Sequence, residues 1–480
     1  MKRIFILTLI LASTVYCTTK QTEASTTELM VTIDPSKTYQ TVEGWGSSLC
    51  WWAGQVGAWD QTKVNTIIDL FTNPDKLNMN IFRYNIGGGD DPAHANGHMA
   101  SGKGKRAEME GFKASATAPY NWDADKAQRN ILLKIKDKRS DAIFEAFSNS
   151  PPYWMTISGC SGGAGADRNT KENLDPKNYL AFSNYLVDVC KHYYDTYGVI
   201  FRNLEPFNES FSHYWYYLGS QEGCHFEPQS QMNVINTLYP VLKNSNLPTQ
   251  LAVSDETNLN QFLTVMNMYK SDGKIFDKVI NLNTHTYSGT NEERISVAKL
   301  VAEIGKPLWV SESGPDGGIE LQSSLLFTQK IFNDMRYMKP SAWIDWQLME
   351  EGNKEWGLLM CNFKDQTYEI LKNYYVRMQL TRFFKRGYTV IETGNDQVLA
   401  ALDPQKKELV IALLNTSDTD KPIKIDLNKF TQSAFTPVLY RTSSSEDCKK
   451  IETSMMVKDH QLSYSILKQS LSTFVIKLGS

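Results

Sequence analysis

The feature that most constrains the fold is a regular alternation of short apolar segments with longer amphipathic ones. The apolar segments have strand character and occupy residues 44–51, 80–86, 142–147, 200–204, 250–253, 279–283, 308–310 and 342–346. Between them, apolar residues at three- and four-residue spacing predict helices over residues 63–71, 124–135, 177–197, 232–243, 261–269, 294–304, 321–338 and 368–386. Parallel strands buried on both faces read as continuous apolar runs, so the pattern predicts an α/β fold, a (β/α)8 TIM barrel over residues 42–386.

The pattern changes after the last predicted helix. Short alternating runs follow at residues 397–402, 408–414, 423–427, 436–440 and 471–476, which is typical of an all-β sandwich. Two strand-like runs on either side of Pro35 and Ser36 are expected to join it. A chain of 480 residues has room for a barrel and one smaller domain. We therefore predict a β-sandwich side domain formed by residues 387–480 and N-terminal strands within residues 27–41.

Residues 1–26 have the composition of a signal peptide followed by a short tail. Lys2 and Arg3 precede an apolar run over residues 4–11, which is too short to cross a bilayer. This predicts export without a transmembrane segment, to a secreted or otherwise extracytoplasmic location. Cys17 could carry the lipid anchor of a surface or periplasmic lipoprotein, although Tyr16 is bulkier than the residue such sites prefer. Lipidation at Cys17 and cleavage before Thr27 both stay open.

Charge and short motifs limit the classes of ligand. The net charge is -3, and Lys and Arg are interspersed with Asp and Glu, which argues against nucleic acid as a partner. There is no CxxC pair for a structural zinc ion, and the Gly87-Gly88-Gly89 run lacks the spacing of a nucleotide-binding loop. We expect no metal and no organic cofactor, and a monomer. Aromatic residues make up 11% of the chain and suit stacking on the apolar faces of sugar rings.

Two glutamates stand where predicted barrel strands end. Glu312 lies in the stretch KPLWVSESG, and Glu209 closes the stretch IFRNLEPFNE about a hundred residues earlier. Active sites of (β/α)8 barrels lie at the C-terminal ends of the strands. Cleaving a glycosidic bond with retention requires two carboxyl groups about 5 to 5.5 Å apart, so Glu209 and Glu312 are the candidate catalytic pair. Glu205, on the same strand as Glu209, is the alternative acid, but it lies deeper and has no asparagine before it.

These motifs resemble those of glycoside hydrolase family 30, in clan A. The resemblance rests on VEGWGSSLCWW, FRYNIGGG, SNSPPYWM, EPFNES, NTHTYSG and WVSESG, and it covers essentially the mature chain. It implies an O-glycosyl hydrolase with a retaining double-displacement mechanism, in which Glu209 is the acid/base and Glu312 the nucleophile. The family's fourth-strand motif is usually Asn-Glu-Pro, whereas this chain has Ser210 in place of the proline.

Other residues at the strand ends are candidates for substrate binding. Asn208 would hydrogen-bond the sugar 2-hydroxyl, a contact expected to strengthen in the transition state. Arg83 would hold Glu312 ionised, because a nearby cation favours the charged form. His285 and Tyr287 could reach Glu312 across the barrel mouth. For each of these side chains, a purely structural role in the barrel interior is the alternative.

Three tryptophans are candidate stacking platforms for sugar rings. Trp154 follows the prolines of the SNSPPYWM motif, and Trp346 ends the eighth predicted strand. Trp52 is a weaker candidate, because one member of the Trp51–Trp52 pair is expected to be buried.

The segments GWGSSLCWWA and NIGGGDDP are most similar to the branch of endo-β-1,6-galactanases. The resemblance implies a secreted enzyme of polysaccharide degradation that acts on a β-linked polysaccharide or oligosaccharide. A β-1,6-glucanase, a xylanase, a glucosylceramidase-like enzyme and a catalytically inactive carbohydrate-binding protein with the same fold stay open as alternatives.

Overall fold

The computed structural model describes residues 28–89, 91, 107–165, 169–317, 320–452 and 454–479. The predicted signal peptide and Cys17 lie outside these residues. Within them, no helix combines the length and the apolar character needed to cross a bilayer.

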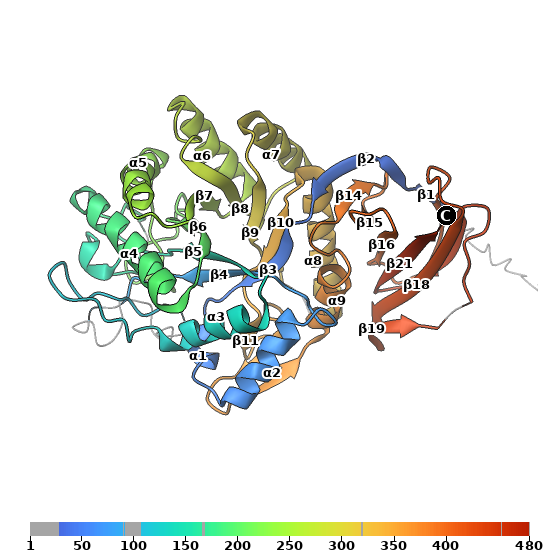
Figure 1. The fold of residues 1–480 in the computed structure, drawn as a ribbon, viewed down its shortest axis with the longest axis horizontal. Coiled ribbons are helices and arrows are strands. Elements are labelled where there is room, and N and C mark those ends of the chain that lie inside the picture. The colour runs from blue at the N-terminus through green and yellow to red at the C-terminus, as the bar shows by residue number, and fades with distance from the viewer. Residues whose placement is uncertain are drawn as a thin grey trace, which may run out of the picture.

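Eight parallel strands close into a barrel in the order β10-β3-β4-β5-β6-β7-β8-β9 (Figure 1). They are β3 (Gly44–Ser48), β4 (Ile81–Asn85), β5 (Ile143–Phe147), β6 (Phe201–Glu205), β7 (Gln250–Glu256), β8 (Val279–His285), β9 (Leu308–Glu312) and β10 (Ala342–Asp345). Each coincides with one of the apolar segments of the sequence, and nearly all their residues are buried. The predicted (β/α)8 barrel is confirmed.

Helices surround the barrel, as Figure 1 shows. They are α1 (Ala53–Val56), α2 (Gln61–Thr72), α3 (Lys126–Lys138), α4 (Tyr179–Tyr197), α5 (Pro228–Asn244), α6 (Leu259–Ser271), α7 (Asn291–Ile304), α8 (Glu320–Asn333) and α9 (Lys372–Thr381). Local sequence signals set several of their ends. A capping box of Thr290 and Glu293 starts α7, and Gly198 ends α4 in the left-handed conformation.

One predicted helix is wrong at its start, and it also extends beyond Thr381, where the observed helix ends. Residues 368–386 were expected to form one helix, but β13 (Thr367–Ile370) precedes α9 and pairs with β12 (Leu359–Asn362), which in turn pairs with β11 (Met349–Glu351). The β13 side chains alternate between exposed and partly buried positions, as expected for a strand at the edge of a small sheet. This three-stranded sheet lies in the connection between β10 and α9.

The all-β sandwich is also confirmed. One sheet has the order β19-β18-β21-β16-β15-β14-β2, and the other has the order β1-β17-β20. The bounds are β1 (Leu29–Thr32), β2 (Asp34–Thr41), β14 (Thr389–Glu392), β15 (Val398–Leu402), β16 (Glu408–Asn415), β17 (Lys421–Asp426), β18 (Ala434–Ser443), β19 (Glu446–Ile451), β20 (Gln461–Ile466) and β21 (Ser470–Gly479). The first two strands of the described chain thus pair with strands from its C-terminal part, although the domain boundaries themselves stay a prediction.

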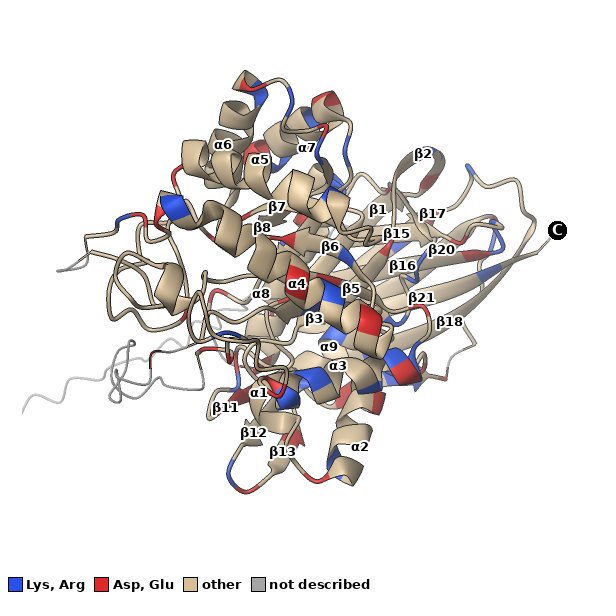
Figure 2. Cartoon of the chain, turned by 60° about the vertical axis from the view of Figure 1, so that its left-hand side comes forward, with Lys and Arg blue, Asp and Glu red and all other residues tan. Residues whose placement is uncertain are grey.

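The sandwich is joined to the barrel through α9. The side-chain amide of Gln379 donates to Thr442 Oγ1 at 3.0 Å and to the carbonyl of Leu471 at 3.4 Å, and all three residues are buried. In Figure 2, the positions of Lys and Arg alternate with those of Asp and Glu along the helices, in keeping with the small net charge.

Candidate active site

A buried arginine gathers the carboxylates at the barrel mouth. Arg83, on β4, is fully buried; its Nε donates to Glu145 Oε1 at 2.9 Å and its Nη1 donates to Glu312 Oε2 at 3.0 Å. Its Nη2 pairs with Asp255, at the end of β7. Burial would lower the pKa of Arg83, but the charges of Asp255, Glu145 and Glu312 raise it above its usual range, so the guanidinium stays charged.

Glu312 ends β9 and is only 3% exposed. The hydroxyl of Tyr287 donates to its Oε1 at 2.8 Å. Burial raises the pKa of this carboxyl and so does the charge of Glu209, while His285, Arg83 and Tyr287 lower it, and the balance is about 7. Near neutral pH, the hydrogen-bond donors around Glu312 therefore decide how much of it is ionised.

Glu209 follows β6 with a left-handed backbone, at φ +50°. Such a conformation is unfavourable for a residue with a side chain, and surrounding contacts must hold it. Its N–H donates to the carbonyl of Asp255 at 2.7 Å, and Trp215 Nε1 donates to its carbonyl at 2.8 Å. A proline at 210 would push Glu209 toward an extended conformation, so Ser210 is compatible with the backbone observed here.

His285 connects the two glutamates. Its Nδ1 lies 3.1 Å from Glu209 Oε1 and 3.5 Å from Glu312 Oε1, and the ligand atoms of the three side chains all lie within 4.8 Å of one another. Burial lowers the pKa of His285, but Glu312, Asp255 and Glu209 raise it to about 10. Metal binding requires a neutral imidazole, so the protonated ring suits hydrogen bonding to carboxylates better than holding a cation.

The glutamates open into a cavity of about 400 Å³. Its lining consists of Glu209, Tyr214, Trp215, Tyr216, Ser220, Gln221, Thr257, Tyr287, Glu312, Trp346 and Trp356. A second cavity of about 290 Å³ shares Ser220, Gln221, Trp346 and Trp356 with it. The two cavities together form an aromatic-lined cleft that is longer than the space around the glutamates alone.

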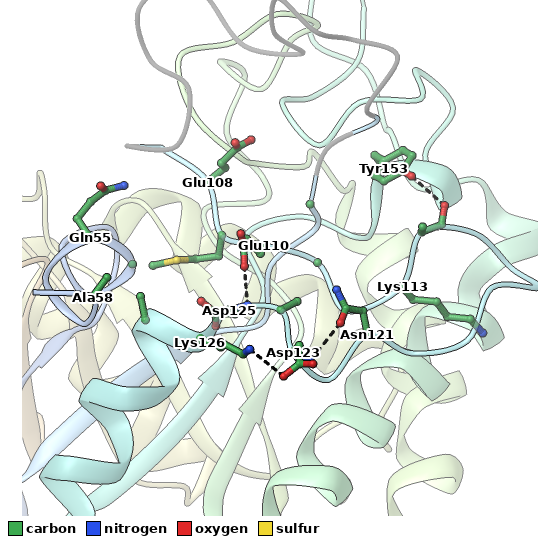
Figure 3. A pocket seen from close by; sticks show the side chains of 17 residues that line it. Gln55, Ala58, Glu108, Glu110, Lys113, Asn121, Asp123, Asp125, Lys126 and Tyr153 are labelled. Carbon is green, nitrogen blue, oxygen red and sulfur yellow. Dashed lines mark hydrogen bonds and ion pairs between the residues drawn. The ribbon is translucent and has the colours of Figure 1, made fainter.

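A larger cavity, of about 920 Å³, lies apart from the glutamates (Figure 3). Carboxylates line it, but they are engaged within the chain: Glu110 accepts from the N–H of Asp125 at 2.7 Å, and Asp123 pairs with Lys126 at 3.0 Å. The chemistry required for hydrolysis is found in the smaller cavity.

Of the other predicted site residues, some line the cleft and others are buried beneath it. Trp346 lines both parts of the cleft. Asn208, next to Glu209, is buried, and its side-chain oxygen has no hydrogen-bond partner among the residues that the structure describes. Glu205 is fully buried and accepts from the N–H of Phe207 at 3.3 Å and from Asn283 at 3.4 Å, so it lies in the barrel interior, as expected.

Trp52 and Trp154 lie differently from Trp346: Trp52 lines the second cavity from a fully buried position, and Trp154 is not among the residues that line either cavity. Trp52 is fully buried, its ring packs edge-on against Phe71, and its indole N–H donates to the carbonyl of Ser48 at 3.0 Å. It is a core residue because helix α2 covers it. Trp154 lies outside the lining of the cleft, where its indole N–H donates to the carbonyl of Lys113 at 2.8 Å.

Several residues of the site were not predicted, among them Glu145, Asp255 and Trp356. Glu145 lies within β5, and a single charged residue in an otherwise apolar strand could have pointed to it. Asp255 lies beyond the apolar run that marked the fifth strand. Trp356 lies in the connection between β11 and β12, where its ring packs on Gly314, since a Cβ at that glycine would stand 2.3 Å from the ring. Only glycine allows this contact.

Comparison with known proteins gives consistent matches. A family model described as O-glycosyl hydrolase family 30 matches residues 28–300. The chain is 30% identical over 414 residues to an endo-β-1,6-galactanase from Hypocrea rufa, and the match covers 83% of each protein. It is 22% identical over 453 residues to an exo-β-1,6-galactobiohydrolase from Bifidobacterium longum subsp. longum, covering 69% of this chain and 29% of that longer protein.

Solved structures show the same fold. A conserved exported protein from Bacteroides fragilis superposes with a TM-score of 0.79 at 17% identity, covering 93% of this chain and 100% of that one. The catalytic domain of a family 30 xylanase C from Talaromyces cellulolyticus superposes with a TM-score of 0.70 at 18% identity, with the same coverage of both chains.

Two carboxyl groups at this spacing, at the mouth of a (β/α)8 barrel, are what hydrolysis of a glycosidic bond demands, so fold and site define an O-glycosyl hydrolase. The matched region extends over more than half of the sequence. The chain belongs to glycoside hydrolase family 30.

Proposed function

We propose that this protein is a retaining endo-β-1,6-galactanase in which Glu312 is the nucleophile and Glu209 the acid/base. The observation that carries the mechanism is the spacing of the two side chains, with carboxylate oxygens within 4.8 Å of each other in an open cavity. That spacing fits the roughly 5 to 5.5 Å of retaining enzymes and leaves no room for the water that an inverting enzyme places between its carboxyls.

The reaction runs in two displacements. Glu312 attacks the anomeric carbon while Glu209 gives its proton to the leaving oxygen, so the glycosidic bond breaks and a glycosyl-enzyme ester forms. Glu209 then removes a proton from water, which attacks the same carbon and releases Glu312. Arg83 and Tyr287 donate to Glu312 and favour its ionised form.

The sugar and linkage follow from the relatives and the cleft. The relative from Hypocrea rufa is an endo-β-1,6-galactanase, and a cleft with two connected cavities suits several sugar units better than one terminal unit. A β-1,6 linkage contains an additional rotatable bond, so ordering the chain costs entropy that several contacts must offset. Trp346 and Trp356, which line both cavities, are in position to supply such contacts.

Incubation with β-1,6-galactan is the test. We expect a ladder of short oligosaccharides, because internal cleavage releases fragments of many lengths, and much lower activity on β-1,6-glucan and xylan. Product sizes resolved by chromatography check the mode of attack. An NMR time course should show the β-anomer first, since two displacements restore the configuration.

Other results would replace parts of the proposal. Release of only mono- or disaccharide would show exo attack, and faster cleavage of glucan or xylan would change the substrate while leaving the family intact. The α-anomer appearing first would contradict the double displacement. No release of reducing sugar from any β-linked glycan would favour the inactive carbohydrate-binding protein.

A conservative change tests how Glu312 is kept ionised. In Tyr287→Phe the hydroxyl that donates to Glu312 Oε1 is lost, so the pKa of Glu312 should rise above about 7. A nucleophile with a higher pKa is ionised only at higher pH, so the acidic limb of kcat/KM should move to higher pH. Initial rates measured from about pH 4 to about pH 9 determine the shift of the acidic limb. An unmoved acidic limb would show that Arg83 and His285 are sufficient to keep Glu312 ionised.

For the location, we propose export directed by the basic and apolar N-terminal segment. Polysaccharides are too large to enter a cell intact, so a secreted or surface enzyme would meet its substrate directly. The lipid anchor at Cys17 and the monomeric state remain part of this proposal. Mass spectrometry of the mature N-terminus would separate lipidation at Cys17 from cleavage before Thr27.

A further inference from the structure

The loop after β6 brings one aromatic side chain, Tyr214, against the acid/base. Its hydroxyl donates to Glu209 Oε2 and lies 3.0 Å from Thr257 Oγ1. Yet 42% of the residue is exposed, and it lines the cavity that contains both glutamates. The hydroxyl of Tyr214 is therefore hydrogen-bonded, while its ring remains accessible from the cleft.

The two oxygens of Glu209 have different neighbours. Oε1 lies 3.1 Å from His285 Nδ1, which also lies 3.5 Å from Glu312, so this oxygen is on the side of the nucleophile. Oε2 accepts from Tyr214. The sugar that becomes attached to Glu312 occupies the nucleophile's side, so the departing sugar lies on the side of Oε2 and Tyr214.

The hydroxyl of Tyr214 has two acceptors in reach but only one hydrogen to donate. When Glu209 is ionised, the Tyr214 hydroxyl donates its hydrogen bond to Glu209 Oε2. When Glu209 carries the proton, the hydroxyl can turn to Thr257 Oγ1, which lies 2.5 Å from Ser212 Oγ. Burial and the charge of Glu209 raise the pKa of Tyr214 well above its usual range, so the hydroxyl keeps its hydrogen in both states.

The neighbouring residue fixes the position of Tyr214. Trp215 is buried, and its ring meets that of Tyr214 edge-on at 4.6 Å between centroids. A Cβ at Gly223 would stand 2.1 Å from the Trp215 ring, and one at Gly163 would stand 2.6 Å from its backbone. Two glycines from different loops thus let Trp215 pack closely, and Tyr214 is held beside the acid/base.

We propose that Tyr214 couples acid/base positioning to binding of the leaving group. Its hydroxyl holds ionised Glu209 and turns to Thr257 when Glu209 is protonated, and its ring supports the departing galactosyl unit. This role rests on the proposed function. Besides Tyr214, the charged and titratable groups around Glu209 and Glu312 are His285, Tyr287, Arg83 and Asp255, and all of them remain in the variants below.

Tyr214→Phe tests the hydroxyl. We expect kcat/KM on β-1,6-galactan to fall about 10-fold, the size of a hydrogen bond to a charged group. An aryl β-galactoside with a good leaving group needs no protonation, so its kcat/KM should be nearly unchanged. A purely structural role of the hydroxyl would instead lower kcat/KM on both substrates by the same factor.

Tyr214→Leu tests the ring. Beyond the effect of Tyr214→Phe, we expect a further loss of about 5-fold on galactan, of the size of an aromatic contact. Tyr217 provides the matched control, because it is 38% exposed on the same loop and its backbone N–H, which any substitution keeps, donates to Gly165. Tyr217→Phe and Tyr217→Leu should match the unsubstituted enzyme.

Equal losses on both substrates in Tyr214→Phe would overturn the role of the hydroxyl. Equal rates for Tyr214→Phe and Tyr214→Leu on galactan would overturn the role of the ring. If the unsubstituted enzyme cleaves the aryl galactoside but not galactan, the proposed substrate is wrong. The Tyr214 proposal is then decided by kcat/KM on aryl galactosides with good and poor leaving groups.

Discussion

Replacing Glu312 with glutamine is expected to abolish hydrolysis of every substrate, lowering kcat by about 10⁵-fold, the scale of losing a catalytic nucleophile. Glutamine has nearly the same shape as glutamate but cannot form the glycosyl ester. Initial rates on galactan and on an aryl β-galactoside measure the loss, and both should fall together. Substantial activity on either substrate would show that Glu312 is not the nucleophile.

The acid/base should behave differently, and this contrast separates the two glutamates. In Glu209→Ala, galactan hydrolysis should fall by about 10³-fold, within the range of general acid catalysis, while a good leaving group departs from an aryl galactoside without a proton. A burst of the phenol followed by slow turnover is the expected signature. Glu205→Gln is the control, since Glu205 lies in the barrel interior and accepts from Phe207 and Asn283. A burst in the Glu205 variant, absent in the Glu209 variant, would reverse the assignment.

Replacing Arg83 with methionine should damage both stability and catalysis. The change leaves Glu145, Asp255 and Glu312 buried without their shared cation, and breaking a buried ion pair on one side costs about 3 to 5 kcal/mol in the free energy of unfolding. Catalysis should fall because Glu312 loses a donor that keeps it ionised. Urea unfolding measures the first effect, and rates per folded molecule measure the second.

The destabilisation caused by Arg83→Met should depend on pH, and its direction follows from the pKa of Asp255. The charge of Arg83 opposes burial and contributes to holding the pKa of Asp255 below its usual range, so this stabilising contribution is present above the unfolded pKa and is lost as pH falls through the folded one. The difference in unfolding free energy between the enzyme and Arg83→Met should therefore shrink at acidic pH. Arg294→Met is the matched control, since it breaks the buried pair of Arg294 with Asp334 at 2.7 Å, away from the glutamates. It should destabilise without lowering the rate per folded molecule.

The barrel and the position of the two glutamates at its mouth could be predicted because their signals are local. Parallel barrel strands are buried on both faces and appear as apolar runs, and Glu312 follows such a run directly. Asp255 was missed because β7 continues through an irregularity between Ser254 and Glu256, past the end of its apolar run. The role of a side chain such as Glu145 becomes visible only in the closed barrel, where it contacts Arg83.

Loop residues were the least predictable part of the site. Trp154 and Trp356 both lie outside the barrel strands; the SNSPPYWM motif pointed to Trp154, which does not line the cleft, whereas no motif pointed to Trp356, which does. Trp356 reaches the cleft because the small sheet β11–β12–β13 carries its segment back over Gly314. That sheet consists of strands of three or four residues with mixed exposure, too short to show a periodic pattern.

The pairing of β1 with β17 has a consequence for the order of biosynthesis. Leu29 lies opposite Ile423, and Thr32 hydrogen-bonds to Asp426, 394 residues away in sequence. The ribosome makes a chain from its N-terminus at about 5 to 20 residues per second, so the first strand waits through most of translation before its partner exists. During that interval the barrel segments, which all lie between the two strands, are available to fold, and the sandwich can close only afterwards.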